Sequence, residues 1–398
     1  MNPFLMTSLL FAFFAVLGAV DAGSVSFDLI AAFPGLRWVR VHLITLGIVT
    51  QSLFGLLPGL VAARHGLPKP RTRLDIWLVL TTGILTLLFG IPLTNEAIMA
   101  TGGTLVFAAV LMLIGQLRSL NPSTSAPETP HPSGRRFYIT GLVYLLFGIY
   151  VGTGLWFGWT IPLGIQVPLE VHIHANNWGL ISLVFAGLLV DLYPRLTGKN
   201  FFWPGSINKI YWLMTLGALG LVIGPWTTWM FFTVPGLLMH LAGTIWLLLN
   251  IIRPLIGSEQ LRKPGPWHLI SSYVWILAPV LVSPLILLNV PGFPGAGIEQ
   301  NAPQALVYGW VLQFSYGLLP YFAAQIIGRS APELGGSWTS LILVHLGGVL
   351  LWASIFFDPI RGLLHGSAYV LWALSLLPIL GQMWGITRGW VEGPVEAV

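Results

Sequence analysis

The sequence predicts an all-α polytopic membrane protein of about 12 transmembrane helices, arranged as three tandem four-helix repeats. Only 8% of the 398 residues are charged and 55% are hydrophobic, whereas soluble proteins carry about 25% charged residues. Apolar runs recur along the chain, each near the length that a helix needs to cross a bilayer. A pair of glycines also recurs at a near-constant period. A chain so poor in charge must present most of its surface to lipid.

The apolar runs place twelve spans, and the connectors between them hold most of the Pro, Gly and charge. The spans are 4–20, 40–62, 74–93, 97–117, 137–157, 171–193, 209–225, 229–252, 268–289, 303–327, 338–356 and 366–386. The most loop-like connector is 121–134, rich in Pro, Ser and Thr. No segment is typical of a soluble domain, so we expect a single membrane domain over 1–398. The first span lacks a basic n-region, which favours a retained helix over a cleaved signal peptide.

The basic residues divide unevenly between the two sides of these spans. Fifteen of the 18 Lys and Arg follow even-numbered spans or lie in the C-terminal tail: Arg64, Lys69, Arg71, Arg73, Arg118, Arg135, Arg136, Arg195, Lys199, Lys209, Arg253, Arg262, Lys263, Arg329 and Arg388. The other side carries Arg37, Arg40 and Arg361. The positive-inside rule therefore predicts cytoplasmic termini, in the cytoplasmic membrane of a bacterium or archaeon. The net charge of +5 is explained by this topology and gives no indication of nucleic-acid binding.

The glycine pairs define an internal repeat. Each pair has the same internal spacing and is followed by Leu-Leu: Gly47 and Gly55, Gly179 and Gly187, Gly309 and Gly317. The copies follow one another at nearly equal intervals along the chain, and each lies in the second span of a four-span unit. The spacing predicts repeats over 1–120, 137–256 and 266–388.

Histidines mark the non-basic ends of two of these repeated helices. His42 aligns with His174 through the repeat, Gln304 takes the position in the third copy, and His172 precedes His174 by two residues. Residues two apart lie about 200° apart around a helix, so the His-x-His pair serves two sites on opposite sides. The chain has no Cys, which excludes thiolate sites, iron–sulfur clusters and covalent c-type haem.

Intramembrane histidines are functional candidates, and neutral imidazole is a good axial ligand for haem iron. We therefore expect one or two non-covalent b-type haems held by His42, His172 and His174. The alternative is that each is a hydrogen-bonded structural residue. Arg37 and Arg40 lie just outside His42, on a face almost without cations, and are candidates to bind haem propionates or to anchor the interface.

Other histidines are candidates of lower rank. His240 and His345 fall mid-span and His365 opens the last span, so each could be a second-site metal ligand, a proton-relay group or a core residue. His65, His131 and His268 lie in or beside the basic loops and are expected to be ordinary residues.

The stretch Val171-HIHANNWGLISLVFAGLLVDLYPRLTG-Lys199 resembles the His-x-His helix of the haem-copper oxidase catalytic subunit, nearest the nitric oxide reductase-like branch. The spacing from His174 to Pro194 matches that family, and Arg40-x-His42 resembles its second helix. The resemblance covers the layout of the whole chain, as twelve helices in three arcs with pseudo-threefold arrangement, but in motif it covers only these two helices. It implies that His172 ligates a high-spin haem and that His174 and His42 form a bis-histidine pair.

The sequence departs from that family in the residues that bind copper. The family has His-x-His in its tenth helix, whereas here it lies in the sixth. The family's His-His pair occurs nowhere in this chain, and span 209–225 has no histidine. These departures argue against a three-histidine copper site and against dioxygen reduction.

Three functions are compatible with these patterns. The first is a haem-copper-oxidase-like b-type cytochrome for respiratory electron transfer or diatomic gas binding, working with other respiratory subunits or with a cytochrome or quinol donor. The second is a terminal oxidase or nitric oxide reductase subunit with a rearranged metal site that uses His240, His345 or His365. The third is a haem-free transporter, which tandem repeats would suit, although Asp191 is almost the only acidic residue within the spans.

Overall fold

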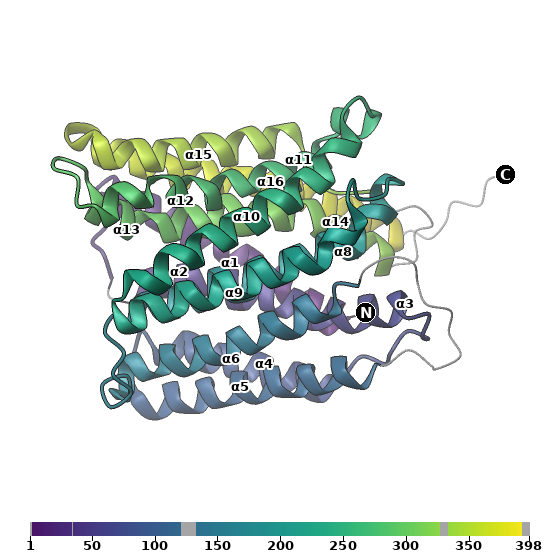
Figure 1. Cartoon of the computed structure of the whole chain (residues 1–398), viewed down its shortest axis with the longest axis horizontal. Coiled ribbons are helices and arrows are strands. Elements are labelled where there is room, and N and C mark those ends of the chain that lie inside the picture. The colour runs from purple at the N-terminus through teal and green to yellow at the C-terminus, as the bar shows by residue number, and fades with distance from the viewer. Residues whose placement is uncertain (1, 34, 121–132, 327–332, 392–398) are drawn as a thin grey trace. The chain divides into compact units, whose positions relative to one another are not determined.

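The computed structural model describes residues 2–33, 35–120, 133–326 and 333–391, and these ranges are helical without β-strand (Figure 1). The predicted loop 121–134 lies almost entirely outside the described residues, as do His131 and Arg329. The chain divides into two compact units. Unit 1 comprises Met1–Thr50 and Glu259–Val398, and unit 2 comprises Gln51–Ser258.

Ten helices in the described ranges are long and apolar enough to cross a membrane. They are Pro3–Ser26, Leu36–Arg64, Glu96–Ser119, Arg135–Phe157, Pro168–Thr197, Pro204–Thr227, Met230–Leu255, Pro264–Leu287, Trp338–Phe356 and Asp358–Ile386. The other two predicted spans correspond to α4 (Leu74–Gly90), a shorter apolar helix, and to the run α13 (Gly295–Gln304), η6 (Ala305–Leu312) and α14 (Gln313–Ile326). The all-α polytopic membrane fold is confirmed. The three-repeat arrangement stays a prediction.

Unit 2 is built around the helix that carries the predicted His-x-His pair. Its elements are α3 (Gln51–Arg64), α4, α5 (Glu96–Ser119), α6 (Arg135–Phe157), α7 (Pro168–His174), η2 (Ala175–Ile181), α8 (Ser182–Thr197), η3 (Pro204–Ser206), α9 (Ile207–Thr227) and α10 (Met230–Leu255). Neighbouring helices α4 and α5 pack side by side, as do α9 and α10 (Figure 1). The continuous run α7–η2–α8 packs on α6 and α9, and 83% of the residues in its most apolar stretch are buried. It is the core of this unit.

Small residues allow α9 and α10 to approach closely. A Cβ on Gly220 would overlap the backbone of Gly236, and one on Gly217 would overlap the backbone of His240. Close approach of this kind is a main source of helix association in lipid, where the hydrophobic effect does not favour one apolar neighbour over another.

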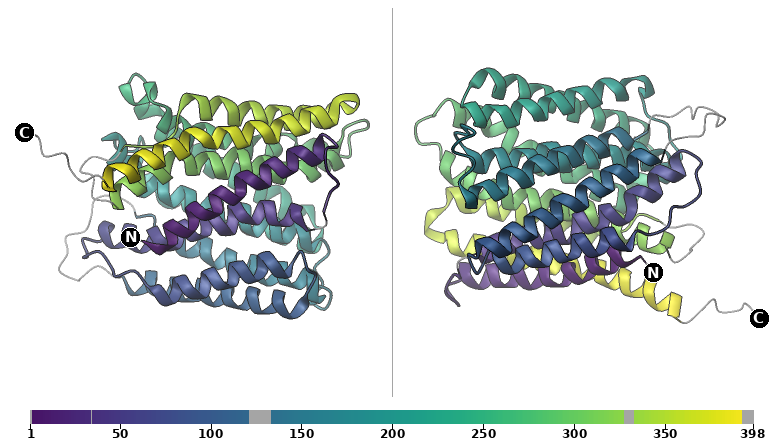
Figure 2. Two further views of the ribbon diagram at one scale, coloured as in Figure 1. Left: turned by 180° about the vertical axis from the view of Figure 1, so that it is seen from behind. Right: turned by 90° about the horizontal axis from the view of Figure 1, so that it is seen from below.

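Unit 1 contains both ends of the described chain. Its elements are α1 (Pro3–Ser26), α2 (Leu36–His42), η1 (Leu43–Thr50), η4 (Glu259–Arg262), α11 (Pro264–Ile270), η5 (Ser271–Tyr273), α12 (Val274–Leu287), α13, η6, α14, α15 (Trp338–Phe356), η7 (Asp358–Ile360) and α16 (Arg361–Val391). Helix α1 lies along α16, drawn in purple and yellow in Figure 2, and also packs on η1. Helices α15 and α16 form a second close pair.

Arginines at the start of α6 form hydrogen bonds with the adjacent ends of α5 and α9 in unit 2. Arg135 Nε, at the start of α6, donates to the carbonyl of Leu117 near the end of α5 (3.0 Å). Arg136 Nη1 donates to Asn208 Oδ1 at the start of α9 (2.6 Å). Since His172 lies at the opposite end of its helix from Arg195, the cations and the His-x-His pair of unit 2 are at opposite ends. Which end faces the cytoplasm stays a prediction.

At the same end of unit 2, the buried side chain of Asp191 links three helices. Asp191 Oδ1 accepts a hydrogen bond from the backbone N–H of Gly134 (2.8 Å), and Oδ2 accepts one from the hydroxyl of Tyr138 (2.8 Å). Arg64 Nε lies 3.8 Å from Oδ1. A buried carboxylate needs such partners to offset its lost hydration. Asp191 therefore has a structural role, in which it links α3, α6 and α8.

Some helix boundaries differ from the predicted spans. The span predicted to begin at 303 begins at Gly295, because the polar segment before Pro303 is also helical. Asn301 and Gln304 are buried there, and Asn301 Nδ2 donates to the carbonyl of Gly297 (2.8 Å). Hydropathy alone ends a span where polar residues begin, although a polar residue with a partner can continue a buried helix.

Candidate functional site

Three π-helical segments lie in the helices that the repeat singles out. Segment η1 begins directly after His42, η2 directly after His174, and η6 directly after Gln304. The three segments therefore begin at equivalent positions of the glycine repeat. π-helical turns are rare and are frequently found at functional sites. The sequence reasoning placed the three positions but did not predict the π-helical backbone.

A glycine within each π segment lies against an aromatic ring from an earlier helix of the same unit. The pairs are Gly47 with Phe11, Gly179 with Tyr144, and Gly309 with Trp275. A Cβ at any of these glycines would overlap the ring. The repeated glycine is therefore explained by close packing, and its regular spacing in the sequence was the signal for it.

His172 and His174 point to different neighbouring helices. His172 Nδ1 lies 2.8 Å from the carbonyl oxygen of Gly148 on α6. His174 Nδ1 lies 2.6 Å from the carbonyl oxygen of Leu221 on α9. The two rings thus lie on opposite sides of their helix, as the spacing predicts, and one iron cannot be bound by both from the same side.

These contacts fix the tautomer of each ring. A carbonyl oxygen can only accept a hydrogen bond, so the proton of the neutral ring is on Nδ1 in both His172 and His174. The lone pair is then on Nε2. Histidines that bind metals have this arrangement, in which the nitrogen away from the metal donates to a carbonyl or carboxylate that fixes the orientation of the ring.

His42 in unit 1 has the same arrangement, but its carbonyl partner belongs to its own helix. Its Nδ1 lies 2.8 Å from the carbonyl oxygen of Trp38, one turn earlier on α2. The indole of Trp38 also stacks on the imidazole, with centroids 3.9 Å apart and planes 14° apart. The ring of His42 is therefore held in orientation by stacking and by a hydrogen bond. The sequence reasoning did not identify Trp38.

The two arginines near His42 contact groups within unit 1. Arg37 Nη2 donates to the carbonyl of Gln300 (2.8 Å), and the amide oxygen of Gln304, turned toward Arg37, accepts from its Nε (3.2 Å) and Nη2 (3.1 Å). Arg40 Nη1 lies 4.0 Å from Asp21 Oδ2. A propionate would share Arg40 with this carboxylate, while Arg37 is exposed. Propionate binding by either arginine stays a prediction.

His240 in unit 2 lies close to the His174 region through a tryptophan. The ring of Trp178 is 5.0 Å from His240 and 6.5 Å from His174, edge-on to both. His240 is buried, its Nδ1 is 3.4 Å from the hydroxyl of Thr244, and its Nε2 makes no hydrogen bond within the described residues. Trp178 thus connects two of the predicted candidates, a link that the sequence did not reveal.

His345 in unit 1 has protein partners for both ring nitrogens. Its Nδ1 accepts from the indole N–H of Trp275 (3.1 Å), so Nε2 carries the proton. That nitrogen is 2.9 Å from the hydroxyl of Ser271 and 3.3 Å from the amide oxygen of Gln313, turned toward it. This network accounts for His345 as a satisfied group between α12, α14 and α15.

The remaining histidines have simpler surroundings. His365 Nδ1 is 2.8 Å from the hydroxyl of Ser26. His268 Nε2 is 3.1 Å from the carbonyl oxygen of Ser337, so it carries the proton. His65 follows the end of α3, where burial and then the charges of Arg135 and Arg64 lower its pKa below the ordinary value. His65 Nε2 and His268 Nδ1 are buried and make no hydrogen bond within the described residues.

No protein-family model matches the chain, and no curated protein matches it either.

Three oriented imidazoles make up the donor set of the candidate site. Within the described residues, no group of three or more His, Asp or Glu side chains is placed to hold a metal ion. A porphyrin supplies four nitrogens of its own, so a haem needs only one or two protein ligands. His42, His172 and His174 each have an oriented ring with its Nδ1 proton held by a carbonyl, and they fit that role.

Proposed function

We propose that this chain is a membrane b-type cytochrome that binds one or two haems at the non-basic helix ends, with His42, His172 and His174 as axial ligands. It would act in respiratory electron transfer or in binding a diatomic gas, within a helix layout like that of haem-copper oxidases. The observation that carries the proposal is the repeated junction. At both His42 and His174, an imidazole with Nδ1–H bound to a carbonyl directly precedes a π-helical segment.

The protein would contribute orientation and burial. The carbonyl of Leu221 holds the proton on His174 Nδ1, and Trp38 does the same for His42 while stacking on its ring. These contacts leave each Nε2 basic and fix the direction of its lone pair. When bound, the haem would supply a one-electron redox couple at its iron. Low polarity around the helix run α7–η2–α8 would restrict water near it.

The cytochrome is favoured over an oxidase or nitric oxide reductase with a rearranged metal site by the surroundings of His345. Trp275, Ser271 and Gln313 already engage both of its nitrogens, so a metal would have to displace part of that network. Copper and non-haem iron are measured as well, because either in stoichiometric amount would support the reductase.

The test is a reduced-minus-oxidised spectrum, a haem extraction and a metal analysis on the purified full-length protein. Wild type should show b-type haem. His42→Ala and His174→Ala should each lose haem or change its spin state. His65→Ala is the matched control, because His65 lies at the basic end of unit 2 and should leave the spectrum unchanged.

The outcomes separate the three functions. A colourless wild type overturns both haem proposals and leaves the transporter. Full haem content with an unchanged spectrum in both His→Ala variants overturns the ligand assignment. Recovery of the spectrum of a His174→Gly variant by added imidazole would show that the side chain acts as a ligand and that its loss did not merely unfold the protein.

A further inference from the structure

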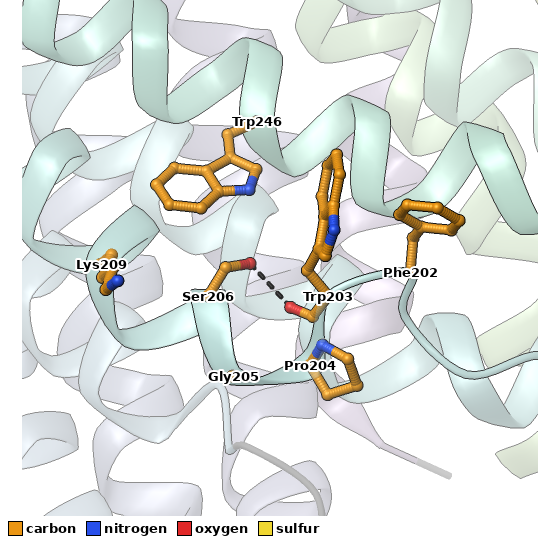
Figure 3. A pocket seen from close by; sticks show the side chains of 7 residues that line it. All are labelled: Phe202, Trp203, Pro204, Gly205, Ser206, Lys209 and Trp246. Atoms are coloured by element: carbon orange, nitrogen blue, oxygen red, sulfur yellow. Dashed lines mark hydrogen bonds between the residues drawn. The ribbon is translucent and has the colours of Figure 1, made fainter.

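A groove of about 610 Å³ opens at the basic end of unit 2, between the segment before α9 and the last turns of α10 (Figure 3). Trp203, Ser206 and Lys209 line one side of it, and Trp246 lines the other. The groove lies at the first turn of α9, whereas His174 contacts Leu221 near the other end of that helix, so the groove is separate from the proposed haem site. Its lining is mainly aromatic and apolar, with one cationic side chain.

A single buried side chain holds the groove in shape. Asn250 on α10 is fully buried, and its Oδ1 accepts from the backbone N–H of Trp203 (2.6 Å). Its Nδ2 donates to the hydroxyl of Ser206 (3.0 Å), which donates to the carbonyl of Trp203 (2.7 Å). The carbonyl of Asn250 accepts from the backbone N–H of Phe202 (3.1 Å). The segment before α9 is therefore ordered by its hydrogen bonds to α10.

The charge of the groove is positive. Lys209 forms no ion pair within the described ranges, and none of the residues that line the groove is acidic. Beside the groove, the guanidinium of Arg253 lies 5.0 Å from the ring centroid of Phe202 and 4.8 Å from that of Trp203. This contact stiffens the wall by cation–π attraction and adds a second positive charge near the rim.

We propose that the groove binds the headgroup of an anionic phospholipid, with its phosphate at Lys209 and its glycerol region between Trp203 and Trp246. Tryptophan favours the level of lipid headgroups, because its ring is apolar and its N–H is polar. Basic pockets between transmembrane helices are typical sites for anionic headgroups. Exposed Phe202 and Trp203 at a helix end are consistent with this depth in the membrane. The proposal does not depend on haem.

The test measures lipid binding by the full chain in neutral detergent. Native mass spectrometry and thermal melting are recorded with phosphatidylglycerol, with phosphatidylcholine and with inorganic phosphate. Phosphatidylglycerol should remain bound and raise the melting temperature, and Lys209→Gln should weaken its apparent affinity about fivefold. Lys209→Arg should restore most of it. Lys199→Gln is the matched control, because Lys199 is an exposed cation of the connector that leads into α9 and lies outside the groove.

Each other outcome overturns the proposal. Equal retention of phosphatidylcholine would show that charge does not select the lipid. An equal shift with inorganic phosphate would assign the groove to a free anion. Equal weakening by Lys199→Gln and Lys209→Gln would show a general surface effect. If Lys209→Gln failed to fold, Lys209→Arg with wild-type stability and weakened phosphatidylglycerol binding would also contradict it.

Discussion

The junction at His174 and the junction at Gln304 share a backbone form but differ in side-chain chemistry. Both precede a π segment, and in both a glycine of that segment lies against an aromatic ring, Tyr144 or Trp275. His174 donates its Nδ1 proton to a carbonyl on another helix. Gln304 accepts hydrogen bonds from Arg37. The π-helical form therefore does not depend on the histidine.

Helix packing and ligand chemistry can therefore be separated in this protein. If the glycine and the ring set the backbone, a change at the histidine should alter cofactor binding and spare the fold. A change at the glycine should destabilise the fold and should affect cofactor binding only as a consequence. Substitutions at the two junctions, at the other histidines and at Arg37 test that separation.

The largest effect is expected from His174→Gln, which gives this junction the side chain found at Gln304. Glutamine is compatible with the π segment but is a poor ligand for haem iron, so haem content should fall about tenfold or more. The melting temperature of the haem-free form should change little. The haem-to-protein ratio measures the first effect and thermal unfolding of both apo forms measures the second. Gln304→Ala, the matched change, should keep its haem.

Gly179→Ala and Gly309→Ala should each destabilise the protein by about 3 kcal/mol, since a methyl group would overlap a ring in a packed helix pair. Unfolding in a mixed detergent series measures the loss. Gly115→Ala is the control, because a Cβ there meets nothing within 4 Å. Equal losses at Gly115 and Gly179 would mean that ring packing does not explain the repeated glycine.

His345→Phe should cost about 2 kcal/mol, because it leaves the buried indole N–H of Trp275 without its acceptor. His240→Phe should cost less than about 1 kcal/mol in the apo protein, since the contacts that it loses, at 3.4 Å to Thr244 and to the backbone of Trp178, are weak. Thermal unfolding of the two apo variants gives the comparison. A larger loss at His240 would indicate that its Nε2 has an important partner.

The smallest effect is expected from Arg37→Gln. The substitution removes the guanidinium that Gln304 contacts, but Arg37 is exposed, so water can replace it and the loss should be about 0.5 kcal/mol. If Arg37 also binds a haem propionate, haem affinity should fall while apo stability barely changes. A change in apo stability alone would confine its role to the Gln304 junction.

Much of the fold could be predicted from the sequence. The apolar runs predicted where the helices lie. The uneven distribution of Lys and Arg among the loops predicted that the cations of unit 2 lie at one end. Hydropathy was less reliable at helix ends, as at Gly295, where polar residues continue the helix. The glycine repeat identified the three positions where the π segments begin.

Local hydropathy, charge and helical geometry specify the membrane fold class, the basic end of unit 2 and the placement of His172 and His174 on opposite sides of their helix, so these features could be predicted from the sequence. The π segments and the hydrogen-bond partners of the rings depend on tertiary packing. The carbonyls that orient His172 and His174 are 24 and 47 residues away in the chain. Contacts of that kind depend on how helices pack, and no local pattern specifies them.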